Sequence, residues 1–211
     1  MTYLEETLYF DYSHPRIQSL INEFDLETTD KLDMVKRICL KVRDGWRYNP
    51  YQISLNPDNF RASTIAVKTD GHCIEKAIVL IACLRAVGVP ARLRLAKVTN
   101  HIAVERLTER WGTNVLTPHG MVDIFLDGQW VKATPAFNEE LCEKCNVQPL
   151  EFDGKTDAVF QEFNHEGEKF MEYLEDYGHF EDVPLDFMMQ NLKEHYPEVF
   201  TSDQGKLEYR F

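Results

Sequence analysis

The sequence predicts an α+β fold in which a buried helix packs on an antiparallel β-sheet. Residues 73–87, CIEKAIVLIACLRAV, are apolar on nearly every side and predict the buried helix. Residues 119–134, HGMVDIFLDGQWVKAT, predict a hairpin, because Asp127-Gly128 favours a two-residue turn between alternating runs. The alternation over residues 92–98 predicts one further, half-buried strand.

Length and charge place the chain among acidic globular proteins. It has 211 residues, 44% of them hydrophobic, with 23 basic and 35 acidic side chains and a net charge of −12. The charge is uneven: residues 1–138 carry 17 basic and 16 acidic side chains, whereas residues 139–211 carry 6 and 19. We expect no nucleic-acid partner, because binding to the phosphate backbone depends on Lys and Arg.

The sequence also argues against membranes and export. The longest apolar run, Ala77 to Leu84, is far shorter than the about 20 residues of a membrane span. The first ten residues, MTYLEETLYF, lack the basic and apolar regions of a signal peptide. Five cysteines, an odd number, favour reduced thiols, so we expect a cytoplasmic protein.

Flanking segments complete the predicted organisation. Ser13 is expected to cap one helix, and a second is expected from Asp30 to Gly45. Residues 99–118 are predicted to be a long connection. Residues 147–211 are predicted to form short helices and loops, with a helix from Pro184 to His195.

Cys73 is the candidate nucleophile because it begins the buried helix. The free N–H groups and dipole of a helix N-terminus stabilise a thiolate and an oxyanion formed beside it. Such a cysteine needs a base, and His119 is the candidate. The hairpin register makes His119 and Thr134 diagonal neighbours on one face. The alternative is that Cys73 is simply a small buried side chain, as free cysteines often are.

Two motifs in this order resemble the transglutaminase-like superfamily. The first is GHCIEKAIVLIACLRAVGVPARL, with the residues Gly71, Cys73, Arg85, Ala86, Gly88, Pro90, Ala91 and Arg92 at the family's motif positions. The second is HGMVDIFLDGQWVKATPAF, which resembles the family's histidine-bearing hairpin. Val42, Arg43 and Tyr48 fit the segment that precedes the first motif, so the resemblance covers roughly residues 30–138.

The resemblance implies a papain-like, transglutaminase-core fold and thiol-dependent acyl transfer. Cys73 takes the nucleophile position and His119 the general-base position. The family has an aspartate just before a proline as its third member, but this chain has Thr134, which brings no negative charge. Asn138 and Asp123 are possible substitutes, although Asp123 is expected to pair with Lys132 across the hairpin.

Two other departures from the family pattern affect the predicted site. Met121 belongs to a His-Gly-Met sequence where the family usually has His-Ala-Trp, which alters the wall of the cleft. His72, beside the nucleophile, either tunes the thiolate or is a solvated loop residue, and we favour the second interpretation.

No cofactor or metal is predicted. Cys142 and Cys145 form a single CxxC pair, which is weak support for zinc without a second pair. The three tryptophans are expected to serve in packing, or in one case to line the cleft. Arg92, Arg94 and Lys97 are expected to form a solvated basic face or to meet the acidic segment.

Two functional hypotheses follow. The first is an enzyme that cleaves or transfers amide groups of a peptide or small molecule through a thioester, with hydrolysis, deamidation and transamidation not separated. The second is an inactive module of the same fold that binds a peptide or protein.

The catalytic domain is predicted to span residues 1–146. Residues 147–211 hold 12 of the 25 aromatic residues and are predicted to pack on that domain at the edge of its cleft, favouring cationic or neutral substrates. The sequence does not predict the oligomeric state.

Overall fold

The computed structural model describes residues 2–24, 30–54, 56–101, 104–197, 200–203 and 206–209. The helices are η1 (Thr2–Leu4), α1 (Pro15–Ile21), α2 (Lys31–Gly45), η2 (Pro57–Phe60), α3 (Ala62–Ile65), α4 (Cys73–Ala86), α5 (Val104–Trp111), α6 (Glu139–Lys144) and α7 (Leu185–His195). The strands are β1 (Arg47–Tyr48), β2 (Asp70–Gly71), β3 (Ala91–Asn100), β4 (Val115–Leu126), β5 (Gln129–Ala133), β6 (Met171–Phe180), β7 (Phe200–Asp203) and β8 (Lys206–Tyr209).

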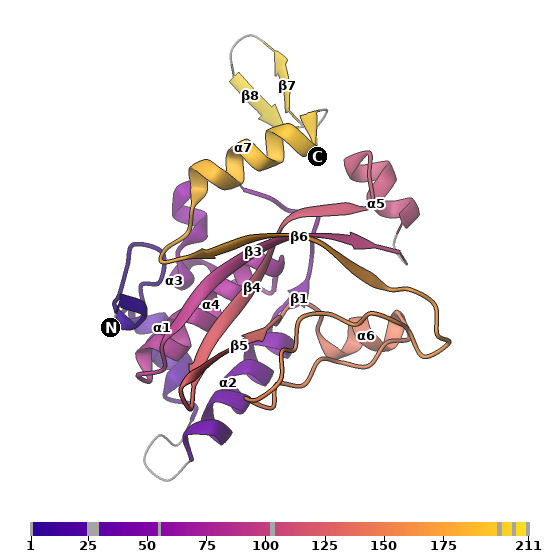
Figure 1. The fold of residues 1–211 in the computed structure, drawn as a ribbon. Helices are drawn as coiled ribbons and strands as arrows, with labels where there is room; N and C mark the ends of the chain where they lie inside the picture. Colours follow the sequence, from indigo (N-terminus) through magenta and orange to yellow (C-terminus); the bar gives the residue numbers. More distant parts are fainter. Residues whose placement is uncertain are drawn as a thin grey trace.

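A four-stranded antiparallel sheet forms the centre of the fold, with strand order β5-β4-β3-β6. The predicted hairpin register is confirmed, because Val122 pairs with Ala133 and Ile124 with Val131. Helix α4 runs behind this sheet (Figure 1), and all its residues from Cys73 to Arg85 are buried. The predicted α+β arrangement of a buried helix on an antiparallel sheet is therefore confirmed.

The two faces of the sheet are both covered. Helices α1, α2 and α4 bury one face in the main core, which includes Leu93, Leu95, Val122 and Ile124. On the other face, Met121 packs in a smaller cluster with Cys142 from α6 and with Phe170 and Met171, which precede or begin β6. The side chains of β4 thus alternate between two hydrophobic environments.

Strand β6 corrects the prediction that residues 147–211 hold only short helices and loops. It pairs with β3 along its whole length, from Leu93 opposite Phe180 to Asn100 opposite Met171. Several side chains in the middle of β6 are exposed, and the strand carries no clean apolar alternation, so its sequence, MEYLEDYGHF, does not resemble a core strand. The predicted helix at residues 184–195 is confirmed as α7.

Two boundary predictions were also wrong. The cap of α1 is His14, whose Nδ1 accepts the N–H of Arg16, while Ser13 donates to Glu6. The long connection expected over residues 99–118 is much shorter, because β3 continues to Asn100, helix α5 follows and β4 begins at Val115. The expected cap of α2 at Asp30 is confirmed.

The predicted ion pair between Asp123 and Lys132 does not form, although the two residues are directly opposite in the β4–β5 ladder. The buried carboxylate of Asp123 accepts hydrogen bonds from Arg92 Nε at 2.9 Å and Arg94 Nε at 2.8 Å. Lys132 Nζ instead lies 2.6 Å from Asp157. Two arginines on the neighbouring strand outcompete one lysine because their rigid donors reach both carboxylate oxygens.

The C-terminal segment is tied to the sheet by polar contacts. Arg94 on β3 pairs with Asp176 on β6, which confirms that acidic residues of the segment meet the basic strand. Near the start of β4, the hydroxyl of Tyr196 accepts the N–H of Thr117 and donates to the carbonyl of Val115, both at 2.8 Å. Thr117 also donates to Asn191 on α7. The division into a catalytic domain of residues 1–146 and an extension of residues 147–211 stays a prediction.

Within the described ranges, no helix is long and apolar enough to cross a membrane.

Candidate active site

Cys73 is the first residue of α4, and its side chain is almost buried, with 8% exposed. Burial raises the pKa of its thiol to about 11, while backbone N–H groups of Gly120, Ile74 and Cys73 itself act in the opposite direction. The predicted effect of the helix N-terminus is therefore present, but desolvation outweighs it. The thiol is protonated at neutral pH, so a thiolate must form through transfer of its proton to a base.

Gly120 brings β4 into direct contact with the start of α4. A Cβ atom at this position would lie 2.8 Å from Cα and 3.0 Å from N of Ile74. Strand β5 ends opposite Val122, so Gly120 lies past its end and presents its N–H group to Cys73. Because His119 precedes Gly120, the same approach places the histidine backbone beside the cysteine.

Replacing Gly120 with Ala should separate the two elements. The new methyl group meets backbone atoms, which cannot rotate away, so we expect a loss of about 1–3 kcal/mol in the free energy of unfolding. Urea denaturation measures this loss, and alkylation of Cys73 should change with it. Gly45→Ala is the control, because nothing lies within 4 Å of that Cβ position. Equal stability of the two variants would contradict the close approach.

His119 is buried more completely than an open hairpin face predicts, with only 2% of it exposed. Burial, and then the nearby His72, lower the pKa of its imidazole to about 4. Its ring is therefore neutral at pH 7 and able to accept a proton. Together with the raised pKa of Cys73, this describes a neutral thiol and a neutral imidazole rather than a thiolate and an imidazolium.

The lowered pKa of His119 predicts a loss of stability in acid. The unfolded chain binds a proton near pH 6.5 and the folded chain only near pH 4, so stability is complete above 6.5 and falls as the pH drops towards 4. The contribution is on the order of 3 kcal/mol. Unfolding curves at several pH values should show that the free energy of unfolding decreases less in acid for His119→Gln than for the wild type. An equal decrease would mean that His119 is not the group responsible.

The third position of the site differs from the family's carboxylate. Thr134 lines a small cavity of about 10 Å³ with His119, but the hydroxyl and His119 Nδ1 have no hydrogen-bond partner within the described part of the chain. The substitutes proposed from the sequence are used elsewhere: Asn138 accepts the N–H of Tyr48 at 3.0 Å, and Asp123 pairs with arginines. The structure thus brings Thr134 to His119, but neither Asn138 nor Asp123.

The prediction that His72 is a solvated loop residue is wrong, because its side chain is buried. It precedes α4, and its backbone N–H donates to Glu75 at 3.1 Å, which caps the helix. Burial lowers the pKa of His72. The neutral ring lies in the wall of a cavity that also reaches Cys73.

The cavity beside Cys73 has a volume of about 50 Å³ and a largely apolar wall. Helix α7 and the residue after it contribute Met188, Leu192 and Tyr196 to this wall. Trp111 also lines it, and its buried Nε1–H has no acceptor among the residues that the structure describes. The sequence does not distinguish which tryptophan reaches the cleft, and the structure identifies Trp111.

A larger cavity of about 370 Å³ lies between α2 and residues 150–158. It includes Thr134 in its wall but neither Cys73 nor His119. The smaller cavities are therefore the ones that hold the candidate chemistry. For the described residues, no cluster of three or more His, Cys, Asp or Glu side chains has the arrangement of a metal site.

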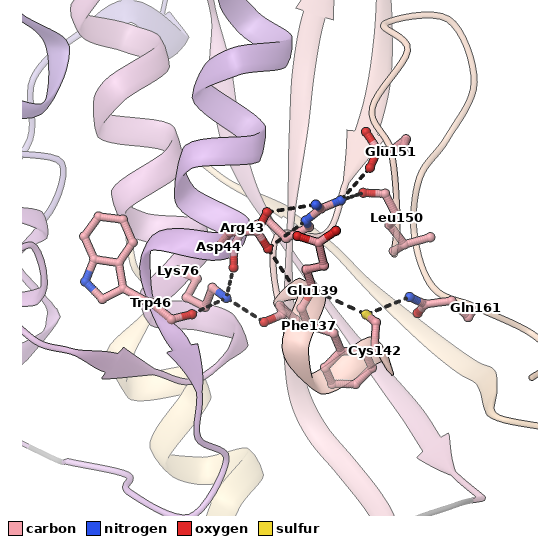
Figure 2. Close-up of polar contacts among 11 residues, drawn as sticks. Arg43, Asp44, Trp46, Lys76, Phe137, Glu139, Cys142, Leu150, Glu151 and Gln161 are labelled. Carbon is pink, nitrogen blue, oxygen red and sulfur yellow. Dashed lines mark hydrogen bonds and ion pairs between the residues drawn. The ribbon is translucent and has the colours of Figure 1, made fainter. Parts of the chain in front are cut away.

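Lys76, one turn after Cys73, was missed in the sequence analysis. Its side chain is fully buried, and Nζ donates to the carbonyls of Arg43, Trp46 and Ala136 at 2.7–2.8 Å (Figure 2). Burial lowers the pKa of Lys76 to about 7. Its three N–H donors join α4 to the end of α2 and to the chain just after Thr134. A lysine within an otherwise apolar helix was the available signal.

Comparison with known proteins agrees with the resemblance seen in the motifs. The transglutaminase-like superfamily matches residues 18–135, more than half of the chain. No curated protein matches the sequence. One similar solved structure, from Cytophaga hutchinsonii, is described as a "Putative Cysteine Protease"; the TM-score is 0.48 and the sequence identity 16%. The match covers 64% of this chain and 40% of the other, so this chain spans less than half of that protein's length. The chain belongs to the transglutaminase-like superfamily.

Proposed function

We propose that this protein cleaves or transfers amide groups through a thioester on Cys73, with His119 as acid and base. In this reaction the thiol proton passes to His119 while sulfur bonds to the substrate carbonyl carbon. The amine then leaves with a proton from His119, and water or another amine resolves the thioester. The substrate is a peptide or small amide in the cytoplasm, without nucleic-acid or membrane partners.

One observation carries this proposal: the sulfur of Cys73 lies at a helix N-terminus, next to the N–H group of Gly120 and beside a cavity. Backbone N–H groups placed in this way are able to stabilise the oxyanion of a tetrahedral intermediate. The buried Nε1–H of Trp111 offers a further donor to a group bound in the same cavity. The small apolar wall favours a small neutral acyl group over an extended charged chain.

A small activated ester, p-nitrophenyl acetate, tests the proposal. We expect a burst of nitrophenol and one acetyl group on Cys73, identified by peptide mass, and both should disappear in Cys73→Ala. His119→Gln should slow acetylation by about 100-fold or more. Cys39→Ala is the matched control. Burial also raises the pKa of the Cys39 thiol, but no histidine is proposed as its base. Acetylation spread equally over the cysteines would contradict the proposal.

The second candidate function is binding without catalysis, and the missing carboxylate favours it. Among described residues, no charged group accepts a hydrogen bond from His119, and α7 forms part of the wall of the cavity beside Cys73. Under this hypothesis, the wild type shows no burst with the ester. In addition, Cys73→Ala should leave the function of the protein in cells intact. Under the enzyme hypothesis, the same substitution should abolish that function.

A further inference from the structure

Gln161 lies outside the residues that match the family, yet its side chain reaches the cavity beside His119. It belongs to the segment between α6 and β6, it is 8% exposed, and it lines the cavity of about 10 Å³ together with His119 and Thr134. A residue of the C-terminal segment therefore forms part of the wall next to the candidate base.

The amide group of Gln161 has a defined orientation. Its Nε2 donates to the carbonyl of Gln148 at 2.8 Å and to the sulfur of Cys142 at 3.7 Å (Figure 2 shows the contact with Cys142). A carbonyl only accepts, so the nitrogen of the amide must face Gln148. This leaves Oε1 buried, and it has no partner within the described ranges. An unpaired buried acceptor costs about 1–3 kcal/mol.

The two other polar residues in the cavity wall, His119 and Thr134, also have a buried polar atom without a partner in the part of the chain that the structure describes. These atoms are Nδ1 of His119 and Oγ1 of Thr134. The cavity volume matches the about 10–15 Å³ that one water molecule needs, and a buried water typically makes about three hydrogen bonds. Three polar side chains around a space of that size describe a site for a single water.

We propose that one water molecule in this cavity joins the imidazole of His119 to Oε1 of Gln161 and to the hydroxyl of Thr134, so that Gln161 is a positioning residue for His119. Because Oε1 only accepts, the water donates to it and uses an oxygen lone pair to accept the N–H of the ring. The ring then holds its proton on the nitrogen facing the cavity and its lone pair on the other nitrogen, for the thiol proton. The inference rests on the proposed role of His119 as the base.

This arrangement orients the histidine without supplying charge. An aspartate fixes the tautomer and also stabilises the imidazolium, whereas an amide, a hydroxyl and a water fix only the tautomer. The pKa of His119, lowered to about 4, agrees with a neutral surrounding. We therefore expect slow proton transfer with correct geometry.

The test measures the tautomer of His119 by nitrogen NMR of histidine-labelled protein, assigned with His119→Gln. The wild type should show one tautomer, and Gln161→Met, which removes the acceptor, should show a mixture and alkylate Cys73 about tenfold more slowly. Gln161→Glu retains an acceptor oxygen, so it should retain the single tautomer at pH values where the His119 ring is neutral. Gln148→Glu, an exposed position, controls for the added charge.

A second prediction follows from the sharing of one water by Thr134 and Gln161. Thr134→Val and Gln161→Met remove two partners of the same molecule, so their effects on the alkylation rate should be less than additive when combined. A high-resolution crystal structure should show the water between the three side chains.

Two outcomes would overturn the inference. One is that Gln161→Met lowers the melting temperature but leaves the tautomer and the alkylation rate of Cys73 unchanged, which means that Gln161 only packs. The other is an electron density map without a water in this cavity. Neither readout needs turnover, so the inference and the proposed function can fail independently.

Discussion

Thr134→Asp is expected to raise the pKa of His119 from about 4 to 6.5 or above and to accelerate alkylation of Cys73 at neutral pH. A carboxylate beside the buried ring stabilises its protonated form, and each pKa unit corresponds to about 1.4 kcal/mol. The acceleration should exceed about tenfold, since replacing the aspartate of a catalytic triad by asparagine costs about 10⁴-fold. NMR titration of His119 and iodoacetamide kinetics measure the two effects.

Thr134→Asn separates charge from shape. Asparagine has nearly the shape of aspartate but leaves the ring without a negative neighbour, so His119 should keep its low pKa. Thr134→Asp should also be less stable than the wild type at pH values where His119 is neutral, because an unpaired charge is then buried. If the two variants behave alike, the missing charge is not what limits the reactivity of Cys73.

Lys76→Met is expected to have the largest effect on stability, with a loss of about 3–5 kcal/mol in the free energy of unfolding. Methionine fills much of the same space but donates no hydrogen bond, so the carbonyls of Arg43, Trp46 and Ala136 are left buried without their donors. Urea denaturation measures the loss.

The matched control for Lys76→Met is Lys193→Met on α7, where the lysine is exposed. That substitution should change the free energy of unfolding by less than about 0.5 kcal/mol. A similar small change for Lys76→Met would mean that the three carbonyls find other donors, and the link between α4 and α2 would then not depend on the ammonium group.

Features with local signals were predicted well from the sequence. Asp127-Gly128 determined the hairpin, whose register then followed from a period of two. The apolar composition of residues 73–87 predicted α4, and its N-terminus singled out Cys73. These predictions rest only on residues that are close in sequence and on the periodicity of their side chains.

Features that depend on distant contacts were not predicted. Gln161 joins the site only because the chain folds back on itself, and it carries no local pattern of a functional residue. One tryptophan was expected in the cleft wall, but nothing local to Trp111 distinguished it from the other two. His72 was expected in solvent because it belongs to the loop that precedes the helix, yet Phe60 and the cavity wall bury it. Strand β6 escaped prediction because the edge of a sheet tolerates an acidic, partly exposed sequence.

The position of β6 in the sheet has a consequence for how the chain is made. β3 pairs with β4 on one side and with β6 on the other, and 70 residues separate Asn100 from Met171. During synthesis, the residues that match the family emerge first, with the outer edge of β3 unpaired and able to pair with other chains. Only when residues 171–180 have left the ribosome does that edge close. The C-terminal third of the chain thus completes the sheet late, and until then β3 is an edge strand whose free N–H and C=O groups favour pairing with other chains.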